Sequence, residues 1–253
     1  MQTGYLHSME TMGLFDGPGI RTVFFLQGCP IRCAYCHNPD SQACDTGRTI
    51  EVKEVLDTAR RFRPYYGSDG GVTFSGGEPL LQGAFLRAAL SALKKEGFNT
   101  TVDTSGFGDP RYYSKVLPLV DTLLLDVKEF SDQRFQELTA GKFQTFLDFM
   151  NGLKDWGFKG RIWVRHVMVP GMTDNEESMR ELVKCIFPIA EFVERIEILP
   201  YHTMGVAKYT ALNREYPLAG VPPMDREEAK DYEIYARRYF RQYLGRFRSR
   251  KIA

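Results

Sequence analysis

Short apolar runs alternate along this chain with longer segments in which apolar residues recur every third or fourth position. Continuous runs of Val, Leu, Ile and Phe are typical of strands covered on both faces, whereas the longer period is typical of helices packed on one side. This pattern predicts strands at residues 22–26, 71–74, 99–103, 121–127, 161–169 and 193–199. It predicts helices at residues 51–62, 79–95, 132–138, 143–156, 176–189 and 225–244.

Local signals indicate where two of these helices begin. Pro79 suits a first helical position because its φ is fixed and it has no N–H to donate. Thr173 or Asp174 is expected to cap the helix that follows the fifth strand. No internal repeat, low-complexity block or clear linker interrupts the alternation.

Regular alternation of strands and helices predicts right-handed βαβ units and a parallel sheet, so the fold class is α/β. An open doubly wound sheet and a partial barrel both satisfy the pattern, and we expect a partial (β/α)6 barrel of the TIM type. We expect a single domain over residues 1–253, with its core at about residues 14–205 and a C-terminal helical extension at about residues 206–253.

Polar candidate residues follow five of the predicted strands. They are a cysteine-rich segment after the first strand, residues 75–78, 103–105 and 126–128 after the next three, and His202 after the last. In parallel α/β sheets and barrels, the C-terminal ends of the strands meet at one rim, where functional groups gather. The sequence therefore predicts one site built from five strand ends.

The composition argues against several classes of partner. A chain of 253 residues with 43% hydrophobic positions can bury a large core. Lys and Arg total 33 against 32 Asp and Glu, so the net charge of +1 favours neither nucleic acid nor an acidic membrane surface. Because no run of 18 apolar residues and no signal-peptide pattern is found, we expect a cytoplasmic protein with no membrane partner.

Three of the five cysteines, Cys29, Cys33 and Cys36, stand in one short segment. Clustered thiols in an intracellular chain indicate metal binding more often than disulfides. Thiolates are the usual ligands of iron–sulfur clusters, and three of them hold three irons of a 4Fe–4S cluster. The fourth iron is then open to a small molecule.

A zinc site with His37 as fourth ligand is the main alternative. Adjacent Cys36 and His37 point apart on most backbones, however, and a structural zinc site usually has a second, distant ligand pair. A redox dithiol would not need the third cysteine. Of the remaining cysteines, Cys44 is expected to be a loop thiol without a chemical role, and Cys185 a small buried apolar residue.

The spacing C-x3-C-x2-C, with Tyr35 before the last cysteine, resembles the radical S-adenosylmethionine (SAM) superfamily. Flanking segments at residues 16–21 (Asp-Gly-Pro-Gly-Ile-Arg), 27–29 and 36–39 narrow the resemblance to activating enzymes of glycyl-radical enzymes. Many such activators carry a cysteine-rich, ferredoxin-like insert after this motif. Only Cys44 lies in the corresponding stretch, and the missing insert favours pyruvate formate-lyase as the partner.

The resemblance implies reductive cleavage of SAM at the cluster, followed by removal of a glycine α-hydrogen from the partner protein. The implied partners are the glycyl-radical loop of pyruvate formate-lyase as protein substrate and a flavodoxin or ferredoxin as electron donor, with a monomeric enzyme. No acid–base residue is needed for the central step. An activator of another glycyl-radical enzyme, a small-molecule radical enzyme and a non-catalytic zinc- or cluster-binding protein remain alternatives.

Gly76, Gly77 and Glu78 stand between a predicted strand and a helix. Two glycines let a backbone approach a ligand closely, and a carboxylate can accept hydrogen bonds from an ammonium group. Taken alone, the segment is equally consistent with a tight strand-to-helix turn. The resemblance implies that it receives the amino group of SAM.

Asp103, Ser105 and Lys128 follow the third and fourth strands. They are expected to form a polar cradle for the carboxylate and ribose of SAM, with Lys128 as the cation. Since buried carboxylates need partners, an ion pair that joins neighbouring strand ends is the alternative. The resemblance also implies that Asp103, Thr104 and Asp126 form a site for a monovalent cation, Na⁺ or K⁺.

Three further residues are expected near the adenosine of SAM by resemblance. Tyr35 would pack against the adenine, Asn38 would form a hydrogen bond beside it, and His202 would lie close to it. Arg165 and His166 are neighbours in the fifth strand, where side chains alternate between faces, so only one of them can point into the site.

Asp16 precedes Gly17, Pro18 and Gly19 and is by itself a turn residue. The resemblance places this loop near the substrate peptide, which makes Asp16 a candidate gate for the substrate.

Overall fold

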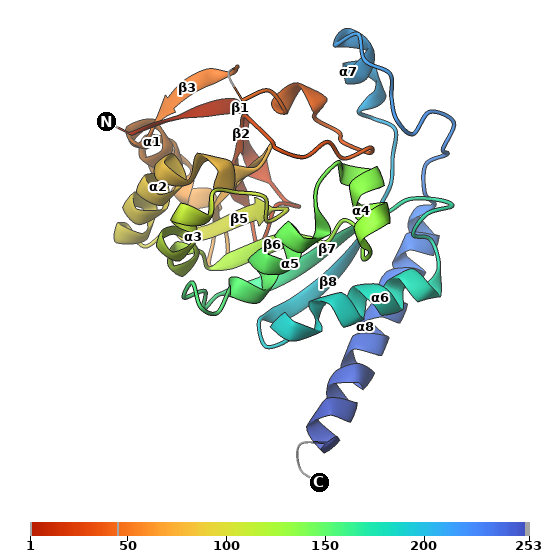
Figure 1. Ribbon diagram of the computed structural model, residues 1–253. Coiled ribbons are helices and arrows are strands. Elements are labelled where there is room, and N and C mark those ends of the chain that lie inside the picture. Colours follow the sequence, from red (N-terminus) through yellow and green to blue (C-terminus); the bar gives the residue numbers. More distant parts are fainter. Residues whose placement is uncertain (1, 45, 251–253) are drawn as a thin grey trace.

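Six parallel strands form the centre of the sheet in the computed structural model, which describes residues 2–44 and 46–250 (Figure 1). They follow one another in chain order across the sheet, from β2 to β4, β5, β6, β7 and β8. Their bounds are β2 Arg21–Leu26, β4 Gly71–Gly76, β5 Asn99–Thr104, β6 Thr122–Asp126, β7 Arg161–Met168 and β8 Val193–Pro200. All six lie where the apolar runs predict them. In β6, for example, Leu123, Leu124 and Leu125 are all fully buried, as expected for a strand covered on both faces.

The sheet is curved but not closed. Side chains from both its first and its last parallel strands, Phe25 of β2 and Leu199 of β8, line one common cavity. The strand order nevertheless ends at two separate edges, β3 and β8. The predicted α/β class, parallel sheet and partial TIM-like barrel are therefore confirmed.

Two antiparallel strands that the pattern does not predict extend the sheet, β1 (Thr3–Gly13) and β3 (Arg48–Glu51). In β1 the consecutive residues Ser8, Met9 and Glu10 are all exposed, as is Met12, so the strand lacks a continuous buried apolar run. Its pairing with β2 also shifts register twice, and each shift breaks the alternation of buried and exposed residues. These two properties explain why the strand was missed.

Helices other than α7 lie on the outside of the curved sheet (Figure 1). Their bounds are α1 Val52–Phe62, α2 Gly83–Lys95, α3 Pro110–Val116, α4 Asp132–Thr139, α5 Phe143–Gly152, α6 Glu176–Ile186, α7 Val206–Ala211 and α8 Arg226–Arg250. The short helices α3 and α7 were not predicted, because fewer than two full periods give no clear pattern.

One predicted helix start and one predicted helix cap are wrong. Pro79 begins a 3₁₀ turn, Pro79–Gln82, and the α-helix itself begins at Gly83. Helix α6 is capped by Asn175, whose side chain accepts a hydrogen bond from the Ser178 amide. Thr173 and Asp174 instead accept bonds from backbone amides of the preceding turn.

Gly17 and Pro18 of the loop before β2 are buried in the interior of the barrel together with Arg21. Arg21 is fully buried, and its guanidinium donates to Thr73 Oγ1 at 2.6 Å, Pro18 O at 2.8 Å and Val72 O at 3.0 Å. Burial lowers the pKa of Arg21 to about 10. Thr73 in turn donates to the carbonyl of Asp16 at 2.7 Å. One buried cation thus joins the loop to the starts of neighbouring strands through carbonyl and hydroxyl oxygens.

Helix α8 runs along the open edge of the sheet at β8 and continues beyond it (Figure 1). Glu233 accepts a hydrogen bond from the Ile198 amide at 3.2 Å, and Arg237 donates to the Ile196 carbonyl at 2.9 Å. These side chains also form an ion pair with each other at 3.0 Å. They occupy backbone groups that an edge strand otherwise leaves open. Among the described residues, no helix is both long and apolar enough to cross a lipid bilayer.

Replacing Arg21 with Lys should destabilise the fold strongly. One ammonium group cannot reach the acceptors that the guanidinium serves, so buried carbonyl groups lose their partners. We expect Arg21→Lys to lower the free energy of unfolding by about 2–4 kcal/mol in urea titrations followed by circular dichroism. The exposed Arg238 provides the control, since Arg238→Lys should change it by less than about 0.5 kcal/mol. Equal midpoints for both variants would contradict this role for Arg21.

Candidate functional site

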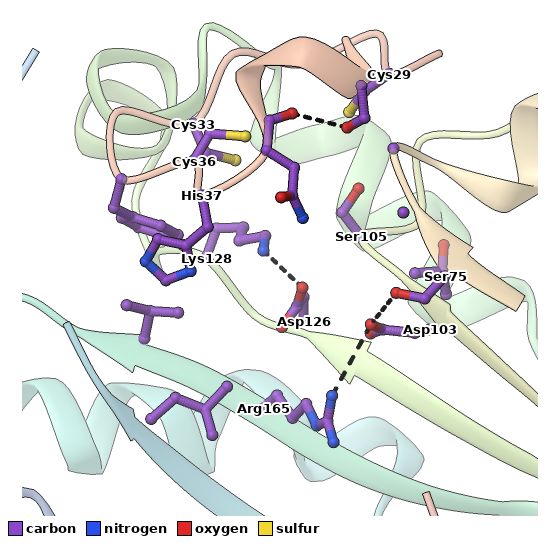
Figure 2. A pocket seen from close by; sticks show the side chains of 18 of the residues that line it. Cys29, Cys33, Cys36, His37, Ser75, Asp103, Ser105, Asp126, Lys128 and Arg165 are labelled. Carbon is purple, nitrogen blue, oxygen red and sulfur yellow. Dashed lines mark hydrogen bonds and ion pairs between the residues drawn. The ribbon is translucent and has the colours of Figure 1, made fainter. Parts of the chain in front are cut away.

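A cavity of about 600 Å³ opens at the C-terminal ends of the parallel strands (Figure 2). The structure brings nearly all of the predicted site residues to its wall. Those that line it are Asp16, Cys29, Cys33, Tyr35, Cys36, Asn38, Gly76, Gly77, Asp103, Thr104, Ser105, Asp126, Lys128 and His202. Glu78 does not line it.

The cysteine loop after β2 is held by backbone hydrogen bonds on two sides. On one side, the Gly28 amide donates to Ser41 O at 2.8 Å. On the other, the Arg32 amide donates to Thr139 O at 2.7 Å and the Ala34 amide to Leu138 O at 2.8 Å, at the C-terminal end of α4. The loop that carries the three sulfur atoms is therefore anchored independently of any bound group.

The three thiols suit an iron–sulfur cluster. Burial, together with the nearby Glu78 carboxylate, raises the pKa of Cys29 to about 12, and burial raises that of Cys33 to about 11. These thiols therefore keep their protons until a metal displaces them. Three soft sulfur donors on one loop, facing a cavity large enough for a further ligand, match the requirements of a cluster with one open iron.

His37, the fourth ligand in the zinc alternative, is engaged elsewhere. Its ring stacks on the ring of His202 with centroids 3.7 Å apart and planes inclined by 15°. Its Nε2 also lies 3.3 Å from the His202 carbonyl oxygen. Among residues 2–44 and 46–250, no three His, Cys, Asp or Glu side chains are grouped as ligands of one metal ion.

Gly76 and Gly77 are required by the contact between the turn after β4 and the cysteine loop. Gly76 has φ +109°, and a Cβ there would lie 2.4 Å from Leu26 N. A Cβ at Gly77 would lie 2.2 Å from Gly28 O. The Gly77 amide donates to Leu26 O, and the Glu78 amide donates to Gly28 O, both at 2.8 Å. The close approach that these glycines allow is first of all between two segments of the protein.

The structure differs from the sequence-based expectation for Glu78. Its fully buried carboxylate accepts bonds from Thr104 Oγ1 at 2.6 Å, Ser105 Oγ at 2.7 Å, the Ser105 amide at 2.9 Å and the Leu80 amide at 3.1 Å. Burial raises its pKa, and these hydrogen bonds oppose that rise. The carboxylate thus braces the end of β5 instead of facing a ligand's ammonium group. The hydroxyl groups of Thr104 and Ser105 are committed to it as well.

Two carboxylates and two cations lie at the wall of the cavity, and Figure 2 shows the links between them. Lys128 Nζ contacts Asp126 Oδ2 at 2.6 Å. Asp103 Oδ2 accepts a bond from Ser75 at 2.7 Å and lies 3.9 Å from Arg165 Nη1. Burial, and then the charge of Asp126, raise the pKa of Asp103. Asp103 Oδ1 is buried without a partner in the described part of the chain, so the cavity offers an unused acceptor.

Arg165, not His166, points into the cavity. Its side chain donates from Nε to Glu197 Oε2 at 3.0 Å and from Nη2 to the Phe15 carbonyl. His166 is fully buried on the other face of β7, where its Nδ1 lies 2.7 Å from Val127 O. The alternation along the strand predicted that only one of them faces the site, and the structure decides which.

Tyr35 and Asp16 occupy different parts of the cavity wall. Tyr35 is buried, with the Lys128 ammonium 5.6 Å from its ring centroid and its hydroxyl without a partner in the described structure. Asp16 lies beside Phe15, whose side chain is 84% exposed. Burial raises the pKa of Asp16, and the charge of Arg165 opposes the rise. The loop of residues 14–20 therefore reaches from the barrel interior to the surface at this site.

Comparisons with known proteins place the chain in a family. A family model described as "Radical SAM superfamily" matches residues 23–183. The "Pyruvate formate-lyase-activating enzyme" of Clostridium pasteurianum is 45% identical over 236 residues, which cover 93% of this chain and 98% of that protein. The chain belongs to the radical SAM superfamily, in the family of pyruvate formate-lyase-activating enzymes.

Further relatives of this radical SAM protein support the assignment. A protein of the same name from Streptococcus mutans is 42% identical over 87% of this chain and 86% of its own length. The crystal structure of a domain of pyruvate-formate lyase-activating enzyme from Bacteroides vulgatus has 22% identity and a TM-score of 0.52. It covers 67% of this chain and 94% of its own, and it supports the fold.

Two residues of the site of this radical SAM protein were not singled out from the sequence. Arg226 lines the cavity, and Glu197 holds Arg165 from the neighbouring strand. Arg165 and Glu197 are paired in the register of β7 and β8, and Arg165 is also paired with Asp126 of β6. Opposite charges at matched positions of adjacent strands were the available signal, but it is visible only once the register is known.

Glu78→Gln should destabilise this radical SAM protein although it conserves size. All four contacts to the carboxylate come from donors, so the amide nitrogen of Gln would face an N–H or O–H group. We expect the free energy of unfolding to fall by about 2–4 kcal/mol in urea titrations. The exposed Glu215 provides the matched control, and Glu215→Gln should leave stability unchanged. If Glu78→Gln were as stable as the control, the bracing role would be refuted.

Proposed function

We propose that this protein activates pyruvate formate-lyase by generating a radical on one of its glycine residues. The observation that carries the proposal is the placement of Cys29, Cys33 and Cys36 on one anchored loop facing a large cavity with charged residues in its wall. Relatives named pyruvate formate-lyase-activating enzyme, up to 45% identical over nearly the full chain, supply the substrate class. They favour this substrate over other glycyl-radical enzymes.

Membership of the radical SAM superfamily implies a 4Fe–4S cluster and SAM. When bound, these groups supply the one-electron cleavage chemistry that removes a hydrogen atom from a glycine Cα. We propose that Cys29, Cys33 and Cys36 hold the cluster. The hydrogen bonds from Gly28, Arg32 and Ala34 keep their loop in place, so the protein's contribution to this step is position.

We propose that the polar wall of the cavity binds the amino-acid part of SAM. Lys128 is bound to Asp126 and still has ammonium donors to offer to a carboxylate. The turn at Gly76 and Gly77 presents backbone to the cavity. Since the Ser105 hydroxyl is committed to Glu78, Ser105 contributes mainly by supporting the wall.

Another part of the wall is proposed to hold the adenosine. Tyr35, Asn38 and His202 all line this cavity, and the stacked rings of His37 and His202 provide a flat surface. Burial lowers the pKa of His202, which favours the neutral imidazole. A neutral ring suits contact with a base better than a solvated cation does.

A monovalent cation, Na⁺ or K⁺, is proposed between Asp103 and Asp126. The unpartnered Asp103 Oδ1 and the negative charge of Asp126 support this placement. Thr104 would contribute its carbonyl oxygen, because its hydroxyl donates to Glu78.

We propose that the glycyl-radical loop of pyruvate formate-lyase enters beside Asp16, which would act as a gate. The exposed Phe15 and the partly buried Asp16 on the cavity wall support this route. We further propose a flavodoxin or ferredoxin as electron donor, a cytoplasmic location, and a monomer whose residues 1–253 form one radical SAM domain. These proposals follow from the family assignment.

Replacing any one of the three cluster cysteines by Ala should abolish cluster assembly. With one sulfur donor removed, an iron loses its ligand, so iron and sulfide contents after anaerobic reconstitution should fall to background. Cleavage of SAM in the presence of dithionite should be lost as well. Cys44→Ala and Cys185→Ala are controls and should retain wild-type contents. Full activity of Cys29→Ala, Cys33→Ala or Cys36→Ala would overturn the cluster assignment.

The substrate assignment is tested by electron paramagnetic resonance. Anaerobic incubation of the reduced holoenzyme with SAM and pyruvate formate-lyase should produce a glycyl-radical signal on the partner, and formate production should follow. A glycerol dehydratase of the glycyl-radical class serves as the control substrate and should give no signal. SAM cleavage without a radical on pyruvate formate-lyase would refute this substrate while leaving the chemistry intact.

A further inference from the structure

The segment between β8 and α8 lies across the cysteine loop. We call residues 202–216, which include α7, the clasp. Gly205 of the clasp packs so closely that a Cβ there would lie 2.9 Å from His37 Cα and 3.0 Å from Cys36 O. Within the clasp, the side chain of Tyr209 is buried, and Arg214 donates to Gln42 Oε1 at 2.9 Å. The clasp therefore touches the loop directly after the last cluster cysteine.

Lys208 of the clasp reaches the side chain of Asn38. Its Nζ donates to Asn38 Oδ1 at 2.7 Å and contacts Asp40 Oδ1 at 3.2 Å. Asp40 is held from its other side by His7, whose Nε2 lies 2.9 Å from Oδ2. One ammonium group thus bridges an amide and a carboxylate on the outer side of the cysteine loop.

This contact fixes which way the Asn38 amide points. An ammonium group can only donate, so the oxygen of the amide must face Lys208 and the nitrogen must face away from it. The main chain of Asn38 is also fixed, since its carbonyl accepts bonds from the Ser41 amide at 2.9 Å and the Ser41 hydroxyl at 2.8 Å. Asn38 lines the cavity, and within the described residues its Nδ2 donates to no protein acceptor.

We propose that Lys208 is a positioning residue that turns the Asn38 amide N–H toward an acceptor atom on the adenosine half of SAM. The inference rests on the proposed function and deepens it. Asn38 lines the same cavity as His37 and His202, whose stacked rings belong to the part of the wall proposed to hold the adenosine. Purine ring nitrogens and ribose oxygens are acceptors. The carboxylate of SAM is proposed to bind a different cation, Lys128.

The test is a double-mutant cycle on SAM affinity, measured by equilibrium dialysis with anaerobically reconstituted, unreduced protein. Lys208→Met and Asn38→Ala should each weaken binding about tenfold, because each removes the same oriented hydrogen bond. If Lys208 acts through Asn38, the double variant should bind no more weakly than Asn38→Ala alone. The proposal would be overturned if the double variant bound SAM about 100-fold more weakly than wild type. It would also be overturned if Lys208→Met bound SAM with wild-type affinity.

Controls separate orientation from general support of the loop. Lys208→Arg also only donates and should restore affinity to within about twofold of wild type. Arg214→Met removes the other basic contact of the clasp, which is made to Gln42. Any loss of SAM affinity that it causes should be independent of Asn38, so the double variant with Asn38→Ala should show the product of the two losses. Iron and sulfide contents are measured for every variant. Loss of the cluster in Lys208→Met would assign Lys208 to cluster retention and would also overturn the proposal.

A second probe locates the acceptor atom. 5′-Methylthioadenosine contains the adenosine but lacks the amino-acid half of SAM, so Lys208→Met should weaken its binding by the same factor. A loss seen only with SAM would place the acceptor on the amino-acid half and refute the assignment to adenosine. Failure of the wild-type holoenzyme to cleave SAM on reduction would instead refute the proposed function. The two failures are therefore distinguishable.

Discussion

The backbone of the turn after β4 lies directly against the backbone of the cysteine loop, and the site depends on this contact. The Gly77 amide donates to the Leu26 carbonyl, and the Glu78 amide donates to the Gly28 carbonyl. The two segments are so close that there is no room for a Cβ at Gly76 or Gly77. The loop therefore cannot move away from the sheet without breaking two buried hydrogen bonds. The same contact places the sulfur atoms above the strand ends, where the polar residues gather.

Glu78 carries this constraint to the next strand. Its backbone belongs to the turn, whereas its carboxylate accepts all of its hydrogen bonds from Leu80, Thr104 and Ser105. The ends of β2, β4 and β5 thus behave as one unit, fixed before any ligand arrives. Asp103 lies in this unit and keeps one buried oxygen unpaired, so the rigid part of the site also contains an unsatisfied acceptor.

The central strands and the composition of the site could be predicted from the sequence because both are local signals. Buried parallel strands are continuous apolar runs, and the three cysteines stand within one short segment. β1 escaped prediction because its consecutive exposed residues and two register shifts hide any simple period. The orientation of Glu78 could not be foreseen, since it follows the turn at Gly76, whose φ is positive. The contact between Lys208 and Asn38 joins residues 170 positions apart, and no local pattern encodes it.

The way α8 covers β8 restricts how another protein can be recruited. A visiting peptide could extend the sheet at this edge only by displacing Glu233 and Arg237, which already bond to the backbone at the middle of the strand. Recognition by β-augmentation is therefore disfavoured on this side of the barrel. A partner that docks beside β8 must therefore be recognised through its side chains and not through main-chain pairing.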